Sequence, residues 1–254
     1  MSLSQPEVTV SVVSHGHGDM VWSLVGQLLA CSEVSRIIVT LNIPEPFPAD
    51  RNDKVIVVKN DHPKGFGENH NAAFAFVNTG FYCVINPDIE LTEDPFHALL
   101  HKLAGRFTGL VAPLVISGGG GVEDSMRPFL TPWTLAKRVL GLASGAYSLS
   151  KGDPAFMPDW VAGMFMLFRS EAYTKVGGFD ERYFMYCEDA DICTRLWKAG
   201  YKVVGCLSTS VIHNAQRASH RSFKHLSWHV RSMARYFWSH SFSLPNKDAV
   251  IQGG

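Results

Sequence analysis

Three carboxylates crowd into four residues at Glu188, Asp189 and Asp191. The pattern from Asp189 to Ala199 predicts a helix, so the acids stand at its positive end. Acids at a helix N-terminus and an i,i+4 pair between Asp191 and Arg195 stabilise a helix without any catalytic role. Those effects need only one or two acids. Crowding three raises the pKa of at least one, which suits a general base that removes a proton from a hydroxyl.

A second group of candidates follows an apolar run. Asn86-Pro-Asp88 comes directly after the strand-like run that begins at Phe81. A carboxylate there can hold a divalent cation against a diphosphate, because Mg²⁺ sites use one or two carboxylates together with phosphate oxygens. The alternative is an aspartate in an Asx-type turn. His213 also ends an apolar run, and its spacing alone favours a core histidine over a metal ligand.

The segment from Lys64 to Asn71 runs from a glycine turn into the start of a predicted helix. Such a turn lets the backbone approach a ligand and aims free N–H groups at anionic atoms. The segment lacks both the phosphate-binding Gly-Lys-Ser/Thr motif and the dinucleotide G-x-G-x-x-G pattern. These absences count against an ATPase and against an NAD-dependent enzyme.

Alternating strands and helices must position these residues. In the first half the predicted strands are 8–14, 36–41, 54–59 and 81–86, and the predicted helices are 21–31 and 67–78. Strand and helix alternation at this spacing predicts βαβ units in an open, mostly parallel α/β sheet. Ligands bind beyond the carboxyl ends of such strands. This rule selects Ser14, Asn42, Asn60 and Asn86, although polar turn residues are common at any strand end.

The second half is less regular. A helix is predicted over 95–105, a flexible loop at the four glycines 118–121, and strands over 110–116 and 161–168. Ser170 is the predicted N-cap of a short helix. A core-like run ends at His213. Two units follow from this pattern, a catalytic domain over 1–215 and a helical tail over 216–254.

Composition restricts the class of protein. Lys plus Arg equals Asp plus Glu at 23 each, so no net charge recruits nucleic acid. The five cysteines form no C-x-x-C pair and predict buried thiols in a reducing compartment. The N-terminus has no signal-peptide pattern, and no apolar run is long enough to span a membrane. We therefore expect a cytoplasmic protein.

Several segments together resemble family 2 glycosyltransferases, most closely the bacterial rhamnosyltransferase-like members. The resemblance covers roughly residues 7–215 and is carried by the first strand, Asn60 to Asn71, Asn86-Pro-Asp88, and above all the ordered series from Asp159 to His213. That series contains Gly177-Gly-Phe-Asp-Glu and Glu188-Asp-Ala-Asp191. The order and spacing of its motifs make it the most specific part of the match.

The resemblance implies a GT-A fold, a nucleotide-diphospho-sugar donor, a divalent cation (Mg²⁺ or Mn²⁺) and inversion at the anomeric carbon. Asp189 matches the catalytic base, with Glu188 and Asp191 as orienting neighbours. Asp88 matches the metal-binding carboxylate, with Asn86 where the family often has another Asp. His213 matches the C-terminal metal ligand, which reverses the preference from spacing alone.

The resemblance also assigns the binding residues. The donor would contact residues at the strand ends, the glycine turn and the central motif: Ser14, Asn42, Asn60, Gly65, Asn69, Asn86, Asp88 and Gly163. The acceptor, a saccharide or a lipid-linked saccharide, would contact Trp160, Phe179 and Asp180. The favoured donor is dTDP-rhamnose, with a UDP-sugar next, and the expected role is synthesis of a bacterial surface polysaccharide. This sequence has Thr40-Leu41-Asn42 where relatives carry an acid-Asn-Gly/Ser pattern.

Two other functions share parts of this pattern. A nucleotidyltransferase uses a similar sheet and metal, but it would carry a basic glycine-rich loop after the first strand, where this chain has Ser14 to Asp19. An inactive nucleotide-sugar-binding domain would not need Asp88, Asp189 and His213 together.

The tail from Arg217 to His240 is basic and aromatic and contains no acid. It is either a helix that touches the inner face of the cell membrane or a helix that packs its aromatic side chains on the core. Arg217 and Arg221 are alternative partners for the diphosphate.

Overall fold

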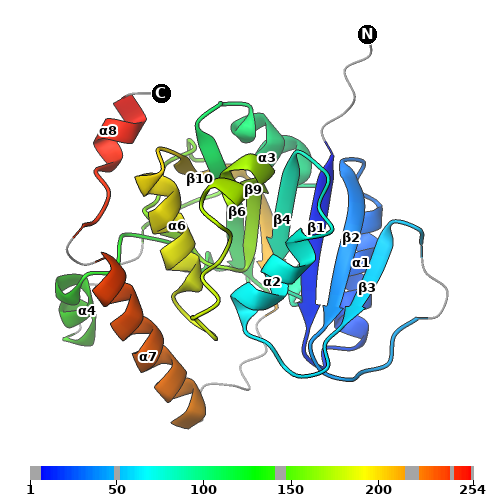
Figure 1. Cartoon of the computed structure of the whole chain (residues 1–254). Coiled ribbons are helices and arrows are strands. Elements are labelled where there is room, and N and C mark those ends of the chain that lie inside the picture. The colour runs from blue at the N-terminus through cyan, green and yellow to red at the C-terminus, as the bar shows by residue number, and fades with distance from the viewer. Residues whose placement is uncertain (1–6, 49–51, 141–146, 215–222, 241–242, 253–254) are drawn as a thin grey trace.

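The computed structural model describes residues 7–48, 52–140, 147–214, 223–240 and 243–252 (Figure 1). The strands are β1 (Val8–Ser14), β2 (Val34–Leu41), β3 (Val55–Lys59), β4 (Phe81–Ile85), β5 (Ile89–Glu90), β6 (Thr108–Ser117), β7 (Met126–Arg127), β8 (Trp160–Val161), β9 (Phe165–Arg169) and β10 (Lys202–His213). The helices are α1 (Asp19–Leu29), α2 (Phe66–Phe74), α3 (Phe96–Leu103), α4 (Pro132–Val139), α5 (Ser170–Lys175), α6 (Glu188–Lys198), α7 (Phe223–His240) and α8 (Lys247–Gln252).

Eight strands form one mixed sheet in the order β3-β2-β1-β4-β9-β6-β10-β5. β1 to β4 are parallel to one another, as the βαβ pattern predicts. β9 runs antiparallel between β4 and β6, and β5 pairs antiparallel with the end of β10. The predicted mostly parallel α/β sheet is confirmed, and the antiparallel strand β9 lies in the half whose pattern is less regular.

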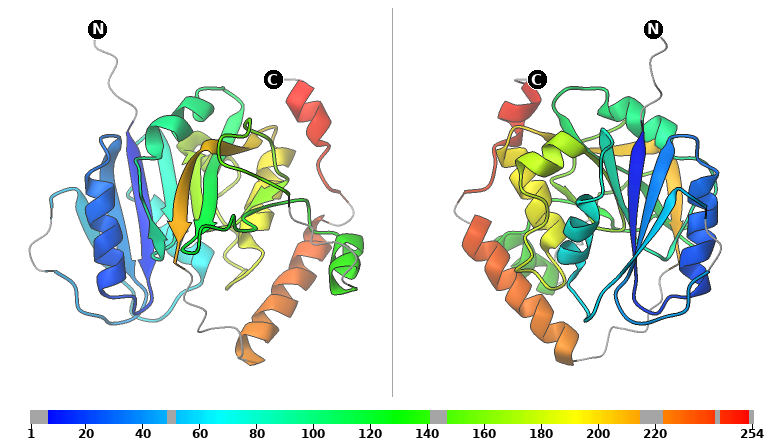
Figure 2. Two further views of the ribbon diagram at one scale, coloured as in Figure 1. Left: turned by 180° about the vertical axis from the view of Figure 1, so that it is seen from behind. Right: turned by 45° about the vertical axis from the view of Figure 1, so that its right-hand side comes forward.

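Helices cover both faces of this sheet (Figures 1 and 2). On one face α1 and α3 pack against alternate residues of the central strands, for example Val10 and Cys83. On the other face α5, α6 and α7 pack against the intervening residues, such as Tyr82 and Val84. Successive side chains of a strand point to opposite faces, so a continuous apolar run such as β4 supplies both cores. All five cysteines are buried and free, as expected.

Three predicted elements differ from the structure. The predicted strand 161–168 is interrupted, because residues 162–164 leave the ladder between β8 and β9. Ser170 is the first residue of α5 rather than its N-cap; Arg169 holds that position with no side-chain cap. The short run that ends at His213 is the end of a twelve-residue strand. The helices α4 and α8 were not predicted.

α7 packs on the core of the protein. Tyr236 is fully buried in the second core, where its hydroxyl lies 2.9 Å from that of Thr194 on α6. This side of α7 therefore faces the core. Within the described ranges, no helix is both long and apolar enough to cross a bilayer. The predicted domain boundary at 215 and 216, with Arg217 and Arg221, lies outside the described residues.

Candidate active site

The carboxyl ends of β1, β2, β3 and β4 meet at one edge of the sheet. The backbone N–H of Asn42 donates to the carbonyl of Ser14 (2.8 Å), and that of Asn60 donates to the carbonyl of Leu41 (3.0 Å). Ser14, Asn42 and Asn60 are therefore neighbours along this edge, as parallel pairing requires. Asn86 stands at the same edge after β4, two strands from Asn42.

An amide network shapes the loop that follows β3. Asn60 Nδ2 donates to Oδ1 of Asn42 (2.8 Å) and to Oδ1 of Asn69 (2.6 Å). Asn42 Oδ1 also accepts from the backbone N–H of Lys64, and Asn69 Nδ2 donates to the carbonyl of Gly65. Asn42 and Asn69 are buried, so their amides fix the course of the glycine turn. Ser14 is buried as well, and its Oγ accepts from the backbone N–H of His17.

Gly65 allows this turn to touch the loop that leads to the acidic cluster. A Cβ atom at Gly65 would lie 2.7 Å from the carbonyl oxygen of Phe184, so no larger residue fits without a shift. The next N–H, from Phe66, donates to that same oxygen (3.0 Å). The glycine turn that we assigned to the donor is thus in direct contact with the loop before α6.

β5 brings Asp88 to His213. β5 pairs with the end of β10, so that Ile89 lies opposite His213 and the N–H of Asn214 donates to the carbonyl of Asp88. His213 Nε2 is 3.1 Å from Asp88 Oδ2, and its Nδ1 is 2.7 Å from Glu123 Oε2. Asp88, followed by Glu123, raises the pKa of His213 to about 9. The protonated ring has two N–H groups and donates one to each carboxylate.

The chemistry of this cluster fits a divalent cation. Oδ1 of Asp88 is buried and has no hydrogen-bond partner. His213 presents one ring nitrogen to Asp88 and the other to a carboxylate, the arrangement that orients metal-binding histidines. No group of three or more His, Cys, Asp or Glu side chains in the described part of the chain is arranged as a metal site. Asp88 supplies one carboxylate, and Mg²⁺ sites combine one or two carboxylates with phosphate oxygens.

A sharp turn delivers the acidic cluster to the same region. Tyr186 and Cys187, which precede α6, have φ angles of 73° and 64°. Two consecutive non-glycine residues in the left-handed region are strained, a feature typical of functional sites. Asp189 follows in the first turn of α6 and is partly buried. Its Oδ1 accepts from the N–H of Ala190 (2.8 Å) and its Oδ2 from the N–H of Gly163 (3.1 Å).

The carboxylates of Glu188 and Asp189 titrate above their ordinary range. Burial raises the pKa of Asp189, against the opposing effects of the N–H groups of Ala190 and Gly163 and the charge of Arg127. Burial and then the charge of Asp189 raise the pKa of Glu188 well above its usual value, and Glu188 Oε2 has no hydrogen-bond partner. Asp189 has N–H donors that favour its anion, so it is the acid of this pair that carries the charge.

Residues 162–164, between β8 and β9, contact both Asp189 and the Asn86-Pro-Asp88 motif. Gly163 donates to Asp189, whereas the carbonyl of the next residue, Met164, accepts from the N–H of Asn86 (2.9 Å). A Cβ atom at Gly163 would lie 3.0 Å from the ring of Phe66, so the segment also touches the glycine turn. One short irregular segment therefore positions the Asn86-Pro-Asp88 motif relative to Asp189.

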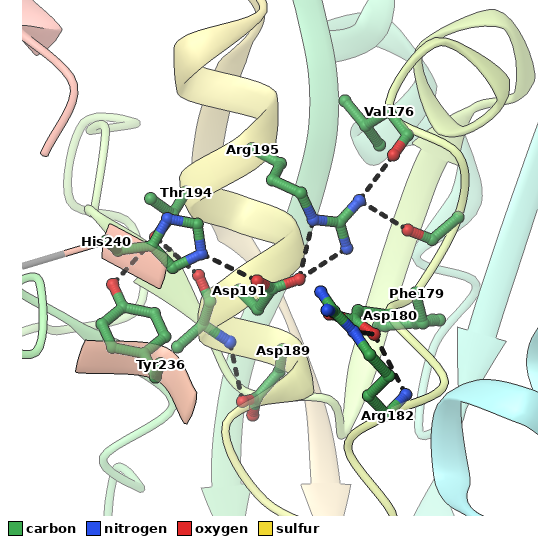
Figure 3. A network of polar contacts seen from close by, with 12 residues as sticks. Val176, Phe179, Asp180, Arg182, Asp189, Asp191, Thr194, Arg195, Tyr236 and His240 are labelled. Atoms are coloured by element: carbon green, nitrogen blue, oxygen red, sulfur yellow. Dashed lines mark hydrogen bonds and ion pairs between the residues drawn. The ribbon is translucent and has the colours of Figure 1, made fainter. Parts of the chain in front are cut away.

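Asp191 has a different environment from its neighbours. Figure 3 shows its carboxylate between Arg195 on the same helix and His240 at the end of α7. Oδ2 accepts from Arg195 Nε (2.7 Å), and Oδ1 is 2.7 Å from His240 Nε2. Arg195 also donates to the carbonyls of Val176 and Gly178. Asp191 is buried and both its oxygens are used, so it ties α6 to α7 and to the loop before α6.

Of the three residues predicted to contact the acceptor, two are buried and the third is partly buried. Trp160 is buried, and its indole N–H donates to the carbonyl of Pro128 (2.7 Å). Phe179 is buried against Phe66 and other aromatic rings. Asp180 is less buried and pairs with Arg182 at 2.6 Å. In this conformation neither aromatic ring offers a face to a substrate.

Sequence reasoning missed three residues of this region. Glu123 follows the four glycines, and its only sequence signal is an acid next to a flexible loop. Arg127 contributes a positive charge at Asp189. His240 contacts Asp191 across 49 positions of sequence. No local pattern connects any of them to the site, because their partners are distant in the chain.

A model of the family described as glycosyl transferase family group 2 matches residues 110–249. Rhamnosyltransferase WbbL of Escherichia coli is 30% identical over 253 residues, which cover 90% of this chain and 92% of that protein. The N-acetylglucosaminyl-diphospho-decaprenol L-rhamnosyltransferase of Mycobacterium tuberculosis is 34% identical over 170 residues, which cover 59% of this chain and only 52% of that longer relative.

Among solved structures, GalNAc-T7 with UDP, GalNAc and Mn²⁺ superposes with a TM-score of 0.72 at 15% identity. The match covers 93% of this chain and 48% of that one. At this identity the likeness concerns the fold, and it confirms the GT-A fold expected from the sequence.

Proposed function

The chain belongs to glycosyl transferase family group 2, and from this premise we propose that it transfers a sugar from a nucleotide-diphospho-sugar to an acceptor hydroxyl with inversion. Both sequence relatives carry the name rhamnosyltransferase, which supports rhamnose as the sugar and synthesis of a surface polysaccharide as the setting. We propose dTDP-rhamnose as the donor, with a UDP-sugar as the second candidate.

The observation that carries this proposal is the shared support of Asp189 and the Asn86-Pro-Asp88 motif. Gly163 binds Asp189, and Met164 binds Asn86. In a direct displacement the nucleophile and the leaving group lie on opposite sides of the reacting carbon. The carboxylate that removes the proton and the carboxylate that holds the leaving diphosphate must therefore keep a fixed separation. A single rigid segment between them meets that requirement.

Asp189 acts as the general base in this proposal. Its carboxylate accepts the proton of the acceptor hydroxyl while the hydroxyl oxygen bonds to the anomeric carbon. The bond from that carbon to the diphosphate oxygen breaks with its electron pair, and the nucleoside diphosphate leaves. The raised pKa of Asp189 supports this role, because a more basic carboxylate accepts a proton more readily. Because Glu188 is neutral, no second negative charge lies beside the Asp189 carboxylate.

Asp88 and His213 would hold a divalent cation, Mg²⁺ or Mn²⁺. The Mn²⁺ in the GalNAc-T7 structure and the orphaned Oδ1 of Asp88 support this assignment. When bound, the cation neutralises charge on the diphosphate. Glu123 would orient His213 through its other ring nitrogen. Asn86, in place of a second carboxylate, leaves the site with little affinity for a cation unless the donor is present.

The amide network would hold the backbone segments that contact the nucleotide. Asn42 and Asn69 hold the turn at Gly65, and Ser14 holds the loop after β1. We propose that Asn60 and the turn itself contact the nucleotide and that the two buried amides act through them.

We propose a lipid-linked saccharide as the acceptor. The name of the mycobacterial relative, with its diphospho-decaprenol, supports this class. Asp180 keeps its proposed acceptor role, because it lies on the partly exposed loop that leads to Asp189. Trp160 and Phe179 would shape the site from within the core.

A donor-release assay tests this function. The protein is incubated with dTDP-rhamnose, UDP-glucose or UDP-N-acetylglucosamine, Mn²⁺ and a synthetic N-acetylglucosaminyl-diphospho-lipid, and nucleoside diphosphate is quantified. We expect acceptor-dependent release of dTDP. Release of inorganic pyrophosphate from dTTP and rhamnose 1-phosphate would indicate a nucleotidyltransferase, and donor binding without release would indicate an inactive binding domain.

A further inference from the structure

The most exposed apolar side chains of this protein gather on two helices. Among the described residues, five large hydrophobic side chains are more than half exposed, and all five lie on α4, directly after it, or on α7: Trp133 68%, Leu140 68%, Leu226 60%, Val230 59% and Trp238 87%. Figures 1 and 2 show α4 beside the C-terminal part of α7. Apolar side chains concentrated in this way indicate an interaction surface.

The exposed side chains of α7 form one ridge. Leu226, Val230, Ala234 and Trp238 follow each other at intervals of four, and all are exposed. Residues at this spacing line one side of a helix. A different side carries the buried Tyr236, which attaches α7 to the core. α7 therefore has two apolar sides. One faces the core, and the other is exposed to solvent.

Cationic side chains flank this ridge without any acid. Neither residues 132–140 nor residues 223–240 contain Asp or Glu. Lys137 lies over the ring of Trp133 on α4 (5.2 Å). On α7, Arg231 is exposed and has no ion-pair partner among the described residues. A groove of about 840 Å³ beside the ridge is lined by Arg182, Phe184, Trp228, Arg231, Arg235 and Trp238, among others.

We propose that α4 and α7 dock this protein on the surface of an anionic lipid bilayer. Tryptophan and aliphatic side chains enter the interface between headgroups and acyl chains, and arginine and lysine bind anionic headgroups. A second copy of this chain fits the same surface poorly. A two-fold contact would place α7 against α7, and the cations of the two copies would repel each other.

The docking surface adjoins the loop that leads to the candidate base. Trp228 packs on Phe184 with ring centroids 4.7 Å apart, and Tyr186 Oη is 2.8 Å from His225 Nδ1. Phe184 also contacts the glycine turn at Gly65. A bilayer against α7 would therefore lie next to the acceptor side of the site. This consequence rests on the proposed function, whereas the docking itself does not.

Vesicle sedimentation of the full chain tests the docking without substrate. Vesicles contain phosphatidylcholine alone or phosphatidylcholine with about 30% phosphatidylglycerol. We expect binding to the anionic vesicles only, and a loss of binding in about 0.5 M NaCl, because salt screens the attraction. Arg231→Gln should weaken binding about fivefold. The double substitution Val230→Ser with Trp238→Ser should weaken it at least about tenfold.

Matched substitutions elsewhere serve as controls. Arg106→Gln and Phe107→Ser change a partly exposed cation and aromatic ring that lie outside both helices, and they should leave binding unchanged. Circular dichroism verifies that each variant is folded, and the single and double substitutions on α7 report independently. Equal binding to both vesicle types, no binding to either, or salt-insensitive self-association that Trp238→Ser abolishes would each overturn the proposal. Failure of sugar transfer with intact vesicle binding would contradict only the proposed reaction.

Discussion

The backbone N–H of Gly163 donates a 3.1 Å hydrogen bond to Oδ2 of Asp189. This bond joins the interruption between β8 and β9 to the first turn of α6, and a second N–H, from Ala190, binds the other oxygen. The side chain that we propose as the base therefore has one fixed orientation before any substrate arrives. Such pre-organisation reduces the cost of aligning a base with its proton.

Replacement of Asp189 tests its role directly. Asp189→Asn removes the proton acceptor, so kcat should fall by about 10² to 10⁴. The dissociation constant for dTDP-rhamnose, measured by calorimetry, should change by less than about twofold, because the donor does not need this carboxylate. Asp248→Asn, at an exposed position on α8, is the matched control and should keep full activity. Loss of donor binding in Asp189→Asn would contradict the assignment as base.

Removal of a proposed metal ligand should abolish stabilisation by the cation. We expect Mn²⁺ together with dTDP to raise the Tm of the wild-type protein by about 5–10 °C at concentrations near 100 times Kd. This shift should disappear in Asp88→Asn and in His213→Ala, and EDTA should remove it from the wild type. Glu90→Gln changes the neighbouring exposed acid on β5, which bonds to Asn214, and it should keep the shift. An unchanged shift in Asp88→Asn would exclude this residue as a ligand.

Asp191 should matter for stability more than for chemistry. Asp191→Asn leaves the partly buried Arg195 without its anion and weakens the contact with His240 on α7. The free energy of unfolding should fall by about 3 kcal/mol, as is usual when one partner of a buried ion pair is removed. Urea unfolding measures this change, and hydrogen exchange should show faster opening of α7.

Asp180→Asn is the comparison for that experiment. Its partner Arg182 is 67% exposed, and solvent screens exposed ion pairs, so this pair should contribute far less to stability than the buried contacts of Asp191. A stability loss in Asp191→Asn no larger than that in Asp180→Asn would show that the contacts between Asp191, Arg195 and His240 do not hold α7 in place.

His70 should make stability depend on pH. Burial lowers the pKa of His70 from 6.5 to about 3 in the folded protein, where its Nδ1 lies 2.9 Å from Ser11 Oγ. As the pH falls below about 6.5, the unfolded chain gains a proton that the folded protein cannot accept. The stability contributed by the neutral ring is therefore complete above pH 6.5 and is lost toward pH 3.

A variant without the imidazole isolates this effect. His70→Asn lacks the titrating group, so the difference in unfolding free energy between wild type and variant should shrink by about 2–3 kcal/mol from pH 7 to pH 4.5. Urea titrations at the two pH values measure it. A difference that stays constant would mean that His70 is protonated equally in both states.

The sequence alone determined the fold class and the central candidates. Apolar runs of five to eight residues separated by helical patterns indicated parallel β1 to β4, and the carboxyl ends of these strands had to meet at one edge. The series that ends at His213 indicated Asp189 within a helix start. These features are local, because they depend on periodicity, on turn residues and on the spacing of motifs within one segment.

Only the tertiary structure decided how the three acids of the cluster differ. The resemblance assigned Asp189 as the base, but only the fold shows the surroundings of each acid. Glu188 Oε2 is buried without a hydrogen-bond partner, Asp189 accepts from two backbone N–H groups, and Asp191 contacts Arg195 and His240. The same holds for Phe179, a plausible acceptor contact in sequence that the fold buries. Burial and the choice of partner depend on segments 26 to 49 positions away that come together only on folding, as the contacts of Asp189 with Gly163 and of Asp191 with His240 show.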